Sequence, residues 1–184
     1  MRHAHLTRLT AASLTLSLAA CGIMPDMPSF KLTNTEGLTE TAVATMLPTE
    51  GSQVSGSVRF VVKGEDTLVD ISLKNLSPGA HGIHVHERGD CSAPDALSAG
   101  AHFNPTGTPH GGLDAPHHLG DLGNIVAGAD GTVILNFHVK GLKLSGEPNI
   151  SGRAVIIHSA ADDLKTQPTG NSGKRLACGV INRT

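Results

Sequence analysis

The sequence predicts an all-β fold, a Greek-key β-sandwich or barrel of about eight antiparallel strands with two long functional loops. Short runs rich in Val, Ile and Thr recur between turn signals, and no long segment has the apolar period of a helix. Two stretches without a strand pattern, 88–121 and 160–174, interrupt this rhythm. The only aromatic residues are 4 Phe among 184 residues, so the core must consist mainly of Val, Ile, Leu and Ala.

The first three predicted strands are separated by short turns. Residues 54–62 (VSGSVRFVV) and 67–75 (TLVDISLKN) flank KGED, which is a hairpin-type turn. The second of these strands is the clearest, because its apolar residues alternate with mostly polar ones, as in a half-buried antiparallel strand. The turn SPGA then leads into the third strand, 80–87 (AHGIHVHE).

Four further strands follow the first long stretch. Residues 124–130 (NIVAGAD) and 132–139 (TVILNFHV) are joined by a hairpin-type turn, ADG. Residues 151–159 (SGRAVIIHS) and 176–181 (LACGVI) are apolar runs on either side of the second long stretch. Long structured loops on a rigid sandwich commonly carry function, so the functional residues are expected in and beside the two stretches.

The segment 1–20 predicts an export signal. Arg2 and Arg8 give it a positive start, and its apolar stretch is too short to span a bilayer. It ends in LAAC, which resembles the lipobox of bacterial lipoproteins, whose cysteine is lipidated and becomes the new N-terminus. The chain has 3 cysteines, which permit one disulfide and leave one over, so the count supports lipidation of Cys21. The alternative is ordinary cleavage after Ala20, which would leave Cys21 as a free thiol.

Residues 21–40 are expected to form a flexible tether behind the lipidated cysteine, and residues 41–184 to form the folded domain. A coil of about 20 residues spans roughly 25 Å on average. The sequence therefore predicts an exported protein that faces the periplasm and is anchored to the cell membrane by lipid on Cys21. The formal net charge of −2 gives no indication of a nucleic-acid partner.

Histidine is the compositional outlier, with 11 residues, and His84 and His86 are the first indication of a metal site. Side chains at positions i and i+2 of a strand share a face, so both imidazoles point the same way. Two imidazoles on one face repel when protonated and cooperate when they bind a metal. By contrast, His81, His117 and His138 are expected to serve structure or the surface.

The long stretch that follows this strand continues the pattern. It contains three histidines and an aspartate spaced as His-x7-His-x7-His-x2-Asp, namely His102, His110, His118 and Asp121. Three nitrogens and one oxygen suit tetrahedral zinc. A further histidine, His158, ends the strand predicted at 151–159. The whole set predicts metal binding, because so many candidate ligands are difficult to explain as incidental.

Six segments are similar, in content and order, to the motifs of the copper/zinc superoxide dismutase family: GIHVHERGDC, GAHFNP, HGG, HLGDLGN, IIHSAADDL and GNSGKRLACGVI. The resemblance covers roughly residues 41–184. It implies a β-sandwich enzyme that converts superoxide to oxygen and hydrogen peroxide and protects against superoxide outside the cytoplasm. It also implies two cofactors, one copper that cycles between oxidation states and one zinc that is structural.

The resemblance assigns a ligand role to each matching position. The copper ligands would be His84, His86, His102 and His158. The zinc ligands would be His102, His110, His118 and Asp121. His102 therefore occurs in both sets, because the family uses one imidazole to bridge the two metals. In the family this bridge opens from copper during the reaction, and the freed nitrogen takes a proton.

Four further residues match supporting positions of the family. Asp162 would accept hydrogen bonds from one copper histidine and one zinc histidine. Arg175 would hold the superoxide anion beside the copper through a charge-assisted hydrogen bond. Cys91 and Cys178 would form a disulfide within the chain, and export would expose them to the oxidising compartment that such a bond needs.

Two other functions compete with the enzyme. The first is a non-enzymatic domain of the same type that stores or delivers copper or zinc, which loss of a copper ligand or of the arginine would favour. The second is a purely structural surface lipoprotein, for which the motif residues would have no purpose. Where better-known animal enzymes carry steering lysines, this chain has Ala160 and Pro168, so Lys165 and Lys174 become the candidates to attract superoxide. The sequence allows a homodimer without requiring one.

Overall fold

The computed structural model describes residues 39–184, which form an all-β fold of eight strands and confirm the predicted class. The strands are β1 (Thr39–Pro48), β2 (Ser55–Lys63), β3 (Asp66–Lys74), β4 (Gly79–His86), β5 (Asp121–Ala127), β6 (Val133–Lys140), β7 (Ala154–His158) and β8 (Arg175–Arg183). A 3-10 helix, η1, spans Leu97–Ala99. The expected signal, Cys21 and nearly all of the expected tether lie outside the described residues. Within 39–184, no helix is long and apolar enough to cross a membrane.

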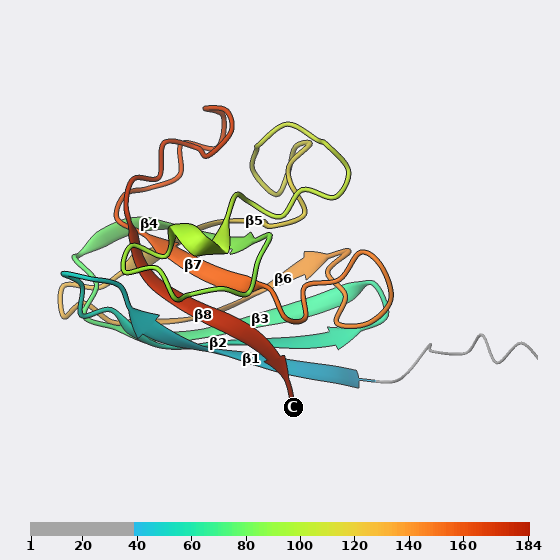
Figure 1. Ribbon diagram of the computed structural model, residues 1–184, viewed down its shortest axis with the longest axis horizontal. Coiled ribbons are helices and arrows are strands. Elements are labelled where there is room, and N and C mark those ends of the chain that lie inside the picture. The colour runs from blue at the N-terminus through green and yellow to red at the C-terminus, as the bar shows by residue number, and fades with distance from the viewer. Residues whose placement is uncertain (1–38) are drawn as a thin grey trace, which may run out of the picture. The chain divides into compact units, whose positions relative to one another are not determined.

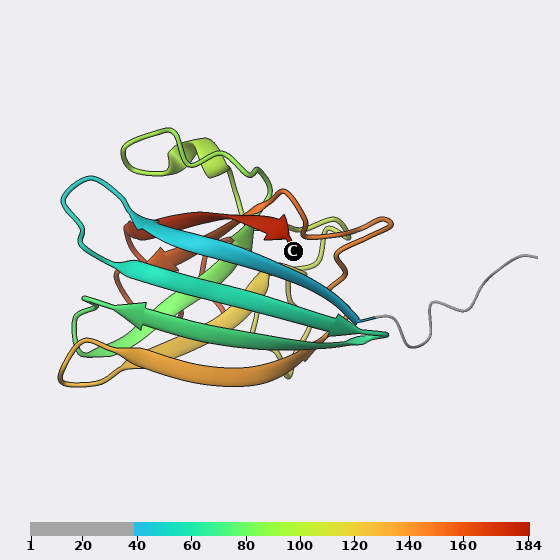
Figure 2. The ribbon, with the colours of Figure 1, turned by 90° about the horizontal axis from the view of Figure 1, so that it is seen from below.

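The strands lie in two layers that curl toward a closed barrel (Figures 1 and 2). One layer contains β1, β2, β3 and β6, the other contains β4, β5, β7 and β8, and the pairing of β1 with β8 joins them. The order along the sheet is β5-β4-β7-β8-β1-β2-β3-β6, and every pair of neighbouring strands is antiparallel. The chain changes layer after β3, β5 and β6, which gives the non-sequential strand order of a Greek key.

The strand β1 is a feature that the sequence analysis missed, since it assigned no strand before residue 54. Ala42, Ala44 and Met46 are buried on one face of β1, while β1 pairs with β2 on one side and with β8 on the other. Alanine is depleted in strands, so this alternation is harder to recognise than the Val and Ile runs elsewhere. The central position of β1 in the sheet compensates for the low preference of its alanines for strand conformation.

The connection 141–153 also differs from the expectation, because the strand predicted from residue 151 begins only at Ala154. The connection is not a surface loop throughout. Leu142, Leu144 and Ile150 are buried in the hydrophobic core, so it closes part of the barrel with apolar side chains. Gly146 and Gly152 have positive φ angles of 72° and 75°, a backbone conformation that strands exclude and that glycine adopts readily.

Figure 1 shows the second of two long loops and the later, yellow-green part of the first above β4 and β5, while the earlier part of the first, with η1, passes in front of β7 and β8. The two loops span 87–120, the first loop, and 159–174, the second loop. A disulfide between Cys91 and Cys178, with 87 residues of sequence separation, ties the first loop to β8. This is the predicted pairing. In the chain-entropy model, a disulfide that closes a loop of this size stabilises the fold by roughly 4–5 kcal/mol.

Candidate metal centre

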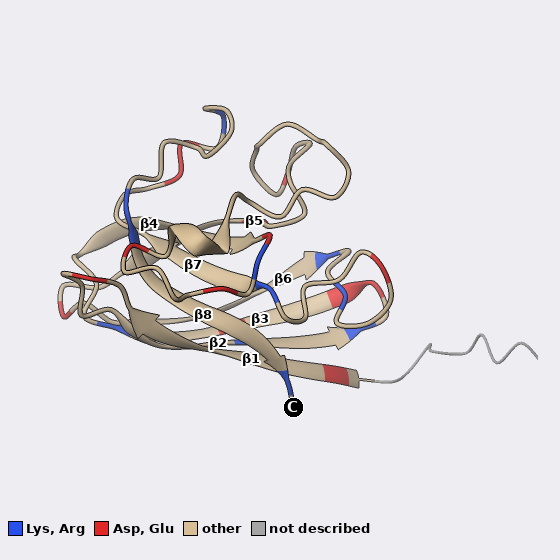
Figure 3. Ribbon diagram, in the orientation of Figure 1, with Lys and Arg blue, Asp and Glu red and all other residues tan. Residues whose placement is uncertain are grey.

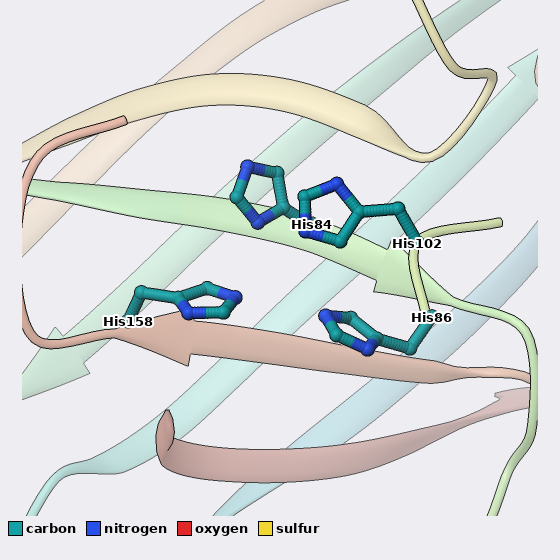
Figure 4. Close-up of side chains that lie close together, drawn as sticks. All are labelled: His84, His86, His102 and His158. Atoms are coloured by element: carbon teal, nitrogen blue, oxygen red, sulfur yellow. The ribbon is translucent and has the colours of Figure 1, made fainter. Parts of the chain in front are cut away.

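Four buried histidines from three parts of the fold converge beside β4 (Figure 4). This four-histidine cluster consists of His84, His86, His102 and His158. One ring nitrogen from each lies within 4.8 Å of the corresponding nitrogen of every other member. His84 and His86 come from β4, His102 from the first loop and His158 from the end of β7.

Backbone pairing explains why these side chains meet. β4 pairs with β7, and the register of β7 against β8 shifts between Ile157 and His158, where the strand ends. His102 is brought in by the return of the first loop along β4, because its backbone forms an isolated antiparallel bridge with that of His86. The amide N–H of Phe103 then donates to the Val85 carbonyl at 2.8 Å, so this part of the loop lies alongside the end of β4.

A second group of ligands shares His102. This mixed cluster consists of His102, His110, His118 and Asp121, all buried, and its ligand atoms also lie within 4.8 Å of one another. Asp121 is the first residue of β5 and lies opposite His84 in the pairing with β4. Its Oδ2 accepts the backbone N–H of His118 at 2.9 Å and that of Gly111 at 3.3 Å. The carboxylate is therefore fixed by the loop that carries the histidines.

The ring nitrogens that point into the two clusters indicate what the clusters hold. Among residues 39–184, six buried histidine nitrogens have no hydrogen-bond partner: His84 Nδ1, His86 Nε2, His102 Nε2, His110 Nδ1, His118 Nδ1 and His158 Nε2. Buried polar groups without partners are rare because they are unfavourable. Four of them belong to the four-histidine cluster, and the other two, His110 Nδ1 and His118 Nδ1, lie 2.9 Å and 3.3 Å from oxygens of Asp121 in the mixed cluster. This arrangement is explained if each cluster holds a cation that the nitrogen lone pairs coordinate. The residues therefore fit a copper ion and a zinc ion.

The opposite ring nitrogens fix these lone pairs in place. The Nε2–H groups of His84 and His110 donate to the two carboxylate oxygens of Asp162, at 2.7 Å and 2.9 Å. His86 Nδ1–H donates to the Gly100 carbonyl at 2.9 Å. Each bond selects the tautomer whose other nitrogen is unprotonated and faces its cluster, which is the usual way in which outer partners orient metal-binding histidines.

Burial keeps three of the imidazoles neutral, whereas contacts with histidines keep the two carboxylates charged. Burial lowers the pKa of His86 to about 2, of His158 to about 3 and of His84 to about 4. Burial alone would raise the pKa of Asp162, but hydrogen bonds from His84 and His110 lower it overall. The pKa of Asp121 is likewise lowered against the effect of burial, mainly by His102. At neutral pH, His84, His86 and His158 are therefore neutral and Asp121 and Asp162 are anionic, and these are the forms of imidazole and carboxylate that bind metals.

Arg175 lies at the mouth of the four-histidine cluster. A cavity of about 580 Å³ is lined by His86, His102 and His158 together with Arg175 and Lys174. The guanidinium donates through Nη1 to the Ala96 carbonyl and through Nη2 to the Gly100 carbonyl, both at 2.6 Å. The Gly100 carbonyl thus accepts hydrogen bonds from both His86 and Arg175, which places the positive charge of Arg175 beside the four-histidine cluster.

Charges of both signs surround this opening. Figure 3 shows basic residues where β8 begins and acidic residues on the loops nearby. Lys174 lines the cavity and Lys165 does not, while Glu50 and Asp95 bring two carboxylates to the same wall. Of the two lysines considered from the sequence, Lys174 is therefore better placed to act on an anion that enters the cavity.

The other three histidines of residues 39–184 belong to neither cluster. His81 is buried, and its ring nitrogens contact the carbonyl oxygens of His158 at 2.8 Å and Ser77 at 2.9 Å. His117 contacts the Ala115 carbonyl, and the exposed His138 pairs with Asp66. These contacts agree with the structural and surface roles expected for them.

Some groups that shape the site escaped the sequence analysis. The Gly100 carbonyl is one, since a backbone group has no signature of its own in the sequence. Asn124 is another: its side chain accepts the Asp162 N–H and donates to the Asp162 carbonyl, each at 2.8 Å. Its position at the end of the segment HLGDLGN, three residues after the candidate ligand Asp121, was the available signal.

Comparison with known proteins agrees with this geometry. Residues 54–181 match the family described as copper/zinc superoxide dismutase (SODC). The chain is 40% identical over 153 residues to the extracellular superoxide dismutase [Cu-Zn] of Brugia pahangi, covering 78% of this chain and 76% of the relative. It is 41% identical over 156 residues to the superoxide dismutase [Cu-Zn] of Paramecium bursaria Chlorella virus 1, covering 80% of this chain and 83% of the relative.

Proposed function

The chain belongs to the copper/zinc superoxide dismutase family, and from this premise we propose a role for each residue of its metal centre. The protein is an oxidoreductase that converts superoxide to oxygen and hydrogen peroxide, with copper and zinc as cofactors. Copper, when bound, supplies the one-electron chemistry, and zinc supplies a fixed charge without redox chemistry.

The four-histidine cluster is assigned to copper and the mixed cluster to zinc. The observation that carries this assignment is the set of six buried histidine nitrogens without hydrogen-bond partners. An all-imidazole group suits copper, whereas three imidazoles and a carboxylate suit zinc. His102 would serve both metals, because its Nε2 faces the four-histidine cluster and its Nδ1 lies 2.8 Å from Asp121 Oδ1 in the mixed cluster.

Three residues then act on the substrate or on the ligands. His102 Nε2 would hold a proton and pass it to the substrate, since it has no hydrogen-bond partner among the described residues and His102 lines the same cavity as Arg175. Arg175 would hold the superoxide anion in the cavity by charge and by its fixed donors. Asp162 would keep His84 and His110 in register, because its two oxygens accept from both rings.

Replacement of Asp121 by alanine is expected to weaken zinc binding before copper binding. Changes to outer partners of metal ligands already reduce affinity by about 10–100-fold, so loss of a ligand should cost more than about a hundredfold. Asp114→Ala is the matched control, since Asp114 is an exposed aspartate in the first loop, seven residues before Asp121. Elemental analysis after dialysis measures both metals. Full zinc occupancy in Asp121→Ala would show that this residue is not a ligand.

The alternative of a non-enzymatic metal-binding domain would be favoured by a missing copper ligand or a missing arginine. This chain retains all seven proposed ligands and Arg175. The enzyme therefore accounts for the same residues and also gives Arg175 a purpose. The homodimer that the sequence allows stays a prediction.

We infer that the protein is exported and held at a membrane by lipid on Cys21, where it would remove superoxide outside the cytoplasm. Two observations support this. The segment 18–21 reads LAAC, and the relative from Brugia pahangi is named as extracellular. The segments 1–20, 21–40 and 41–184 would then be the signal, the lipidated tether and the enzyme domain, with the enzyme facing the periplasm.

Replacement of Cys21 by serine is expected to move the protein from the membrane fraction to the soluble fraction. A serine cannot carry the thioether-linked lipid, and residues 39–184 contain no helix that could span the bilayer instead. Cell fractionation with immunoblotting and labelling with a tagged fatty acid measure the change. The lipid anchor is wrong if the variant is processed and stays in the membrane like the parent.

A further inference from the structure

Gln167 makes a reciprocal contact with a proposed zinc ligand. Its side-chain Oε1 accepts the backbone N–H of His110 at 2.8 Å, and its Nε2 donates to the His110 carbonyl at 2.8 Å. Both backbone polar groups of His110 are thus occupied by one side chain from the second loop. The same Nε2 also donates to the Lys165 carbonyl at 3.1 Å, which keeps the amide in this orientation.

The second loop that carries Gln167 is itself held in place. Near its start, the Asn124 side chain bonds both the N–H and the carbonyl of Asp162 at 2.8 Å. Within the loop, the Asp163 N–H donates to the Gly170 carbonyl at 2.8 Å, and the Gly170 N–H donates to the Thr166 carbonyl at 2.7 Å. Gln167 therefore projects from a turn that is closed by hydrogen bonds and whose base is fixed to β5.

The same turn covers the hydrogen bond between Asp162 and His110. A Cβ atom at Gly170 would collide with Asp162 Oδ1 and with His110 Nε2. Gly170 also has a φ of 61°, a conformation that glycine adopts at no steric cost. The backbone of the second loop thus lies directly against the outer side of the His110 ring, while Gln167 holds the backbone of the same residue.

We propose that Gln167 is a positioning residue for zinc, which locks His110 between the second loop and Asp162 and slows the release of the metal. This inference rests on the proposed role of His110 as a zinc ligand. Because the His110 ring is buried and lies against the backbone at Gly170, we expect its departure from the mixed cluster to involve its own backbone, and that movement breaks both bonds to Gln167. Loss of these bonds should leave the other zinc ligands in place and let His110 separate from the zinc more easily.

The expected effect is specific to zinc. Outer partners of metal ligands change metal affinity by about 10–100-fold. Because the Gln167 side chain is exposed, we expect its effect to lie at the lower end of this range. Zinc release from Gln167→Met should therefore be about tenfold faster than from the parent. Copper release should change much less, because Gln167 contacts none of the four-histidine cluster's backbone groups and His110 belongs only to the mixed cluster.

The test uses the metal-loaded protein and follows zinc transfer to a chromophoric chelator in Gln167→Met. Methionine keeps a similar length and volume but offers no amide. Gln53→Met is the matched control, because Gln53 is the chain's other glutamine, is exposed and uses its backbone carbonyl rather than its side chain to bond Asn75. The visible spectrum of cobalt bound in place of zinc reports ligand geometry, and thermal unfolding of the metal-free proteins reports general stability.

The proposal predicts faster zinc release and an altered cobalt spectrum in Gln167→Met alone, with an unchanged midpoint of unfolding for the metal-free protein. Zinc release at the parent's rate would overturn it. An equal loss of thermal stability with and without metals would also overturn it, because Gln167 would then serve only the fold. If the parent itself bound no zinc, the ligand assignment would fail before the role of Gln167 arose.

Discussion

Replacing His102 with alanine is expected to reduce dismutase activity by at least about a hundredfold and to disturb both metal sites at once. A positioned group that transfers a proton contributes about 10²–10⁴-fold to a rate, and here the same ring would also supply a ligand to each metal. His102 is 5% exposed, and its Nε2 has no protein partner. Alanine removes both ring nitrogens, so each cluster loses one of its ligands.

The matched control for this substitution is His138→Ala, which removes an exposed imidazole that pairs with Asp66 on the surface. It should keep both metals and full activity. Copper absorption, elemental analysis and a superoxide assay on both variants separate the effects. If His102→Ala kept a normal copper spectrum, bound zinc like the parent and turned over at the parent's rate, His102 would not be a ligand that the two metals share.

Arg175→Ile is expected to lower the rate by about tenfold, the lower range of electrostatic steering, while both metals stay bound. Superoxide is a small anion with little surface, so its affinity must come from charge. Burial lowers the pKa of Arg175 and the Asp95 charge raises it, but a guanidinium stays protonated in proteins. Isoleucine removes that charge and the donors that bond Ala96 and Gly100.

Ionic strength distinguishes steering from a structural effect. Added salt screens attraction between exposed charges, so the parent's rate should fall with salt and the Arg175→Ile rate should fall less. Arg175→Lys keeps the charge without the fork of donors and should lie between them. If Lys165 and Lys174 supply most of the field, Arg175→Ile will keep the parent's salt slope and the double lysine variant will lose it. Full activity together with full metal content in Arg175→Ile would remove Arg175 from the mechanism.

The sequence predicted the fold class and most strands because side-chain alternation is a local property. It predicted β3 well, where Val69, Ile71 and Leu73 are buried and the polar residues that follow each of them are exposed. It missed β1, whose alanines carry little strand preference even though the strand sits between β2 and β8. It also placed the start of β7 too early, because residues 151 and 152 form a turn in which Gly152 has a φ of 75°.

The candidate site was predictable for a different reason. Its candidate ligands are histidines and one aspartate at fixed spacings in the sequence. The segments that carry them resemble the motifs of a known family. The supporting contacts were not predictable in this way. The Gly100 carbonyl that joins His86 to Arg175 and the Gln167 amide that holds His110 depend on which loops lie side by side. Such contacts follow from the packed fold and leave no motif.

The most direct test of the account is an element-specific anomalous X-ray measurement on crystals of the metal-loaded protein, with data collected on each side of the copper and zinc absorption edges. The account predicts one copper peak bonded to His84 Nδ1 and to the Nε2 atoms of His86, His102 and His158, the inward-facing nitrogens. It predicts one zinc peak bonded to His102, His110, His118 and Asp121. A copper peak within the mixed cluster, or two peaks that do not share His102, would contradict it.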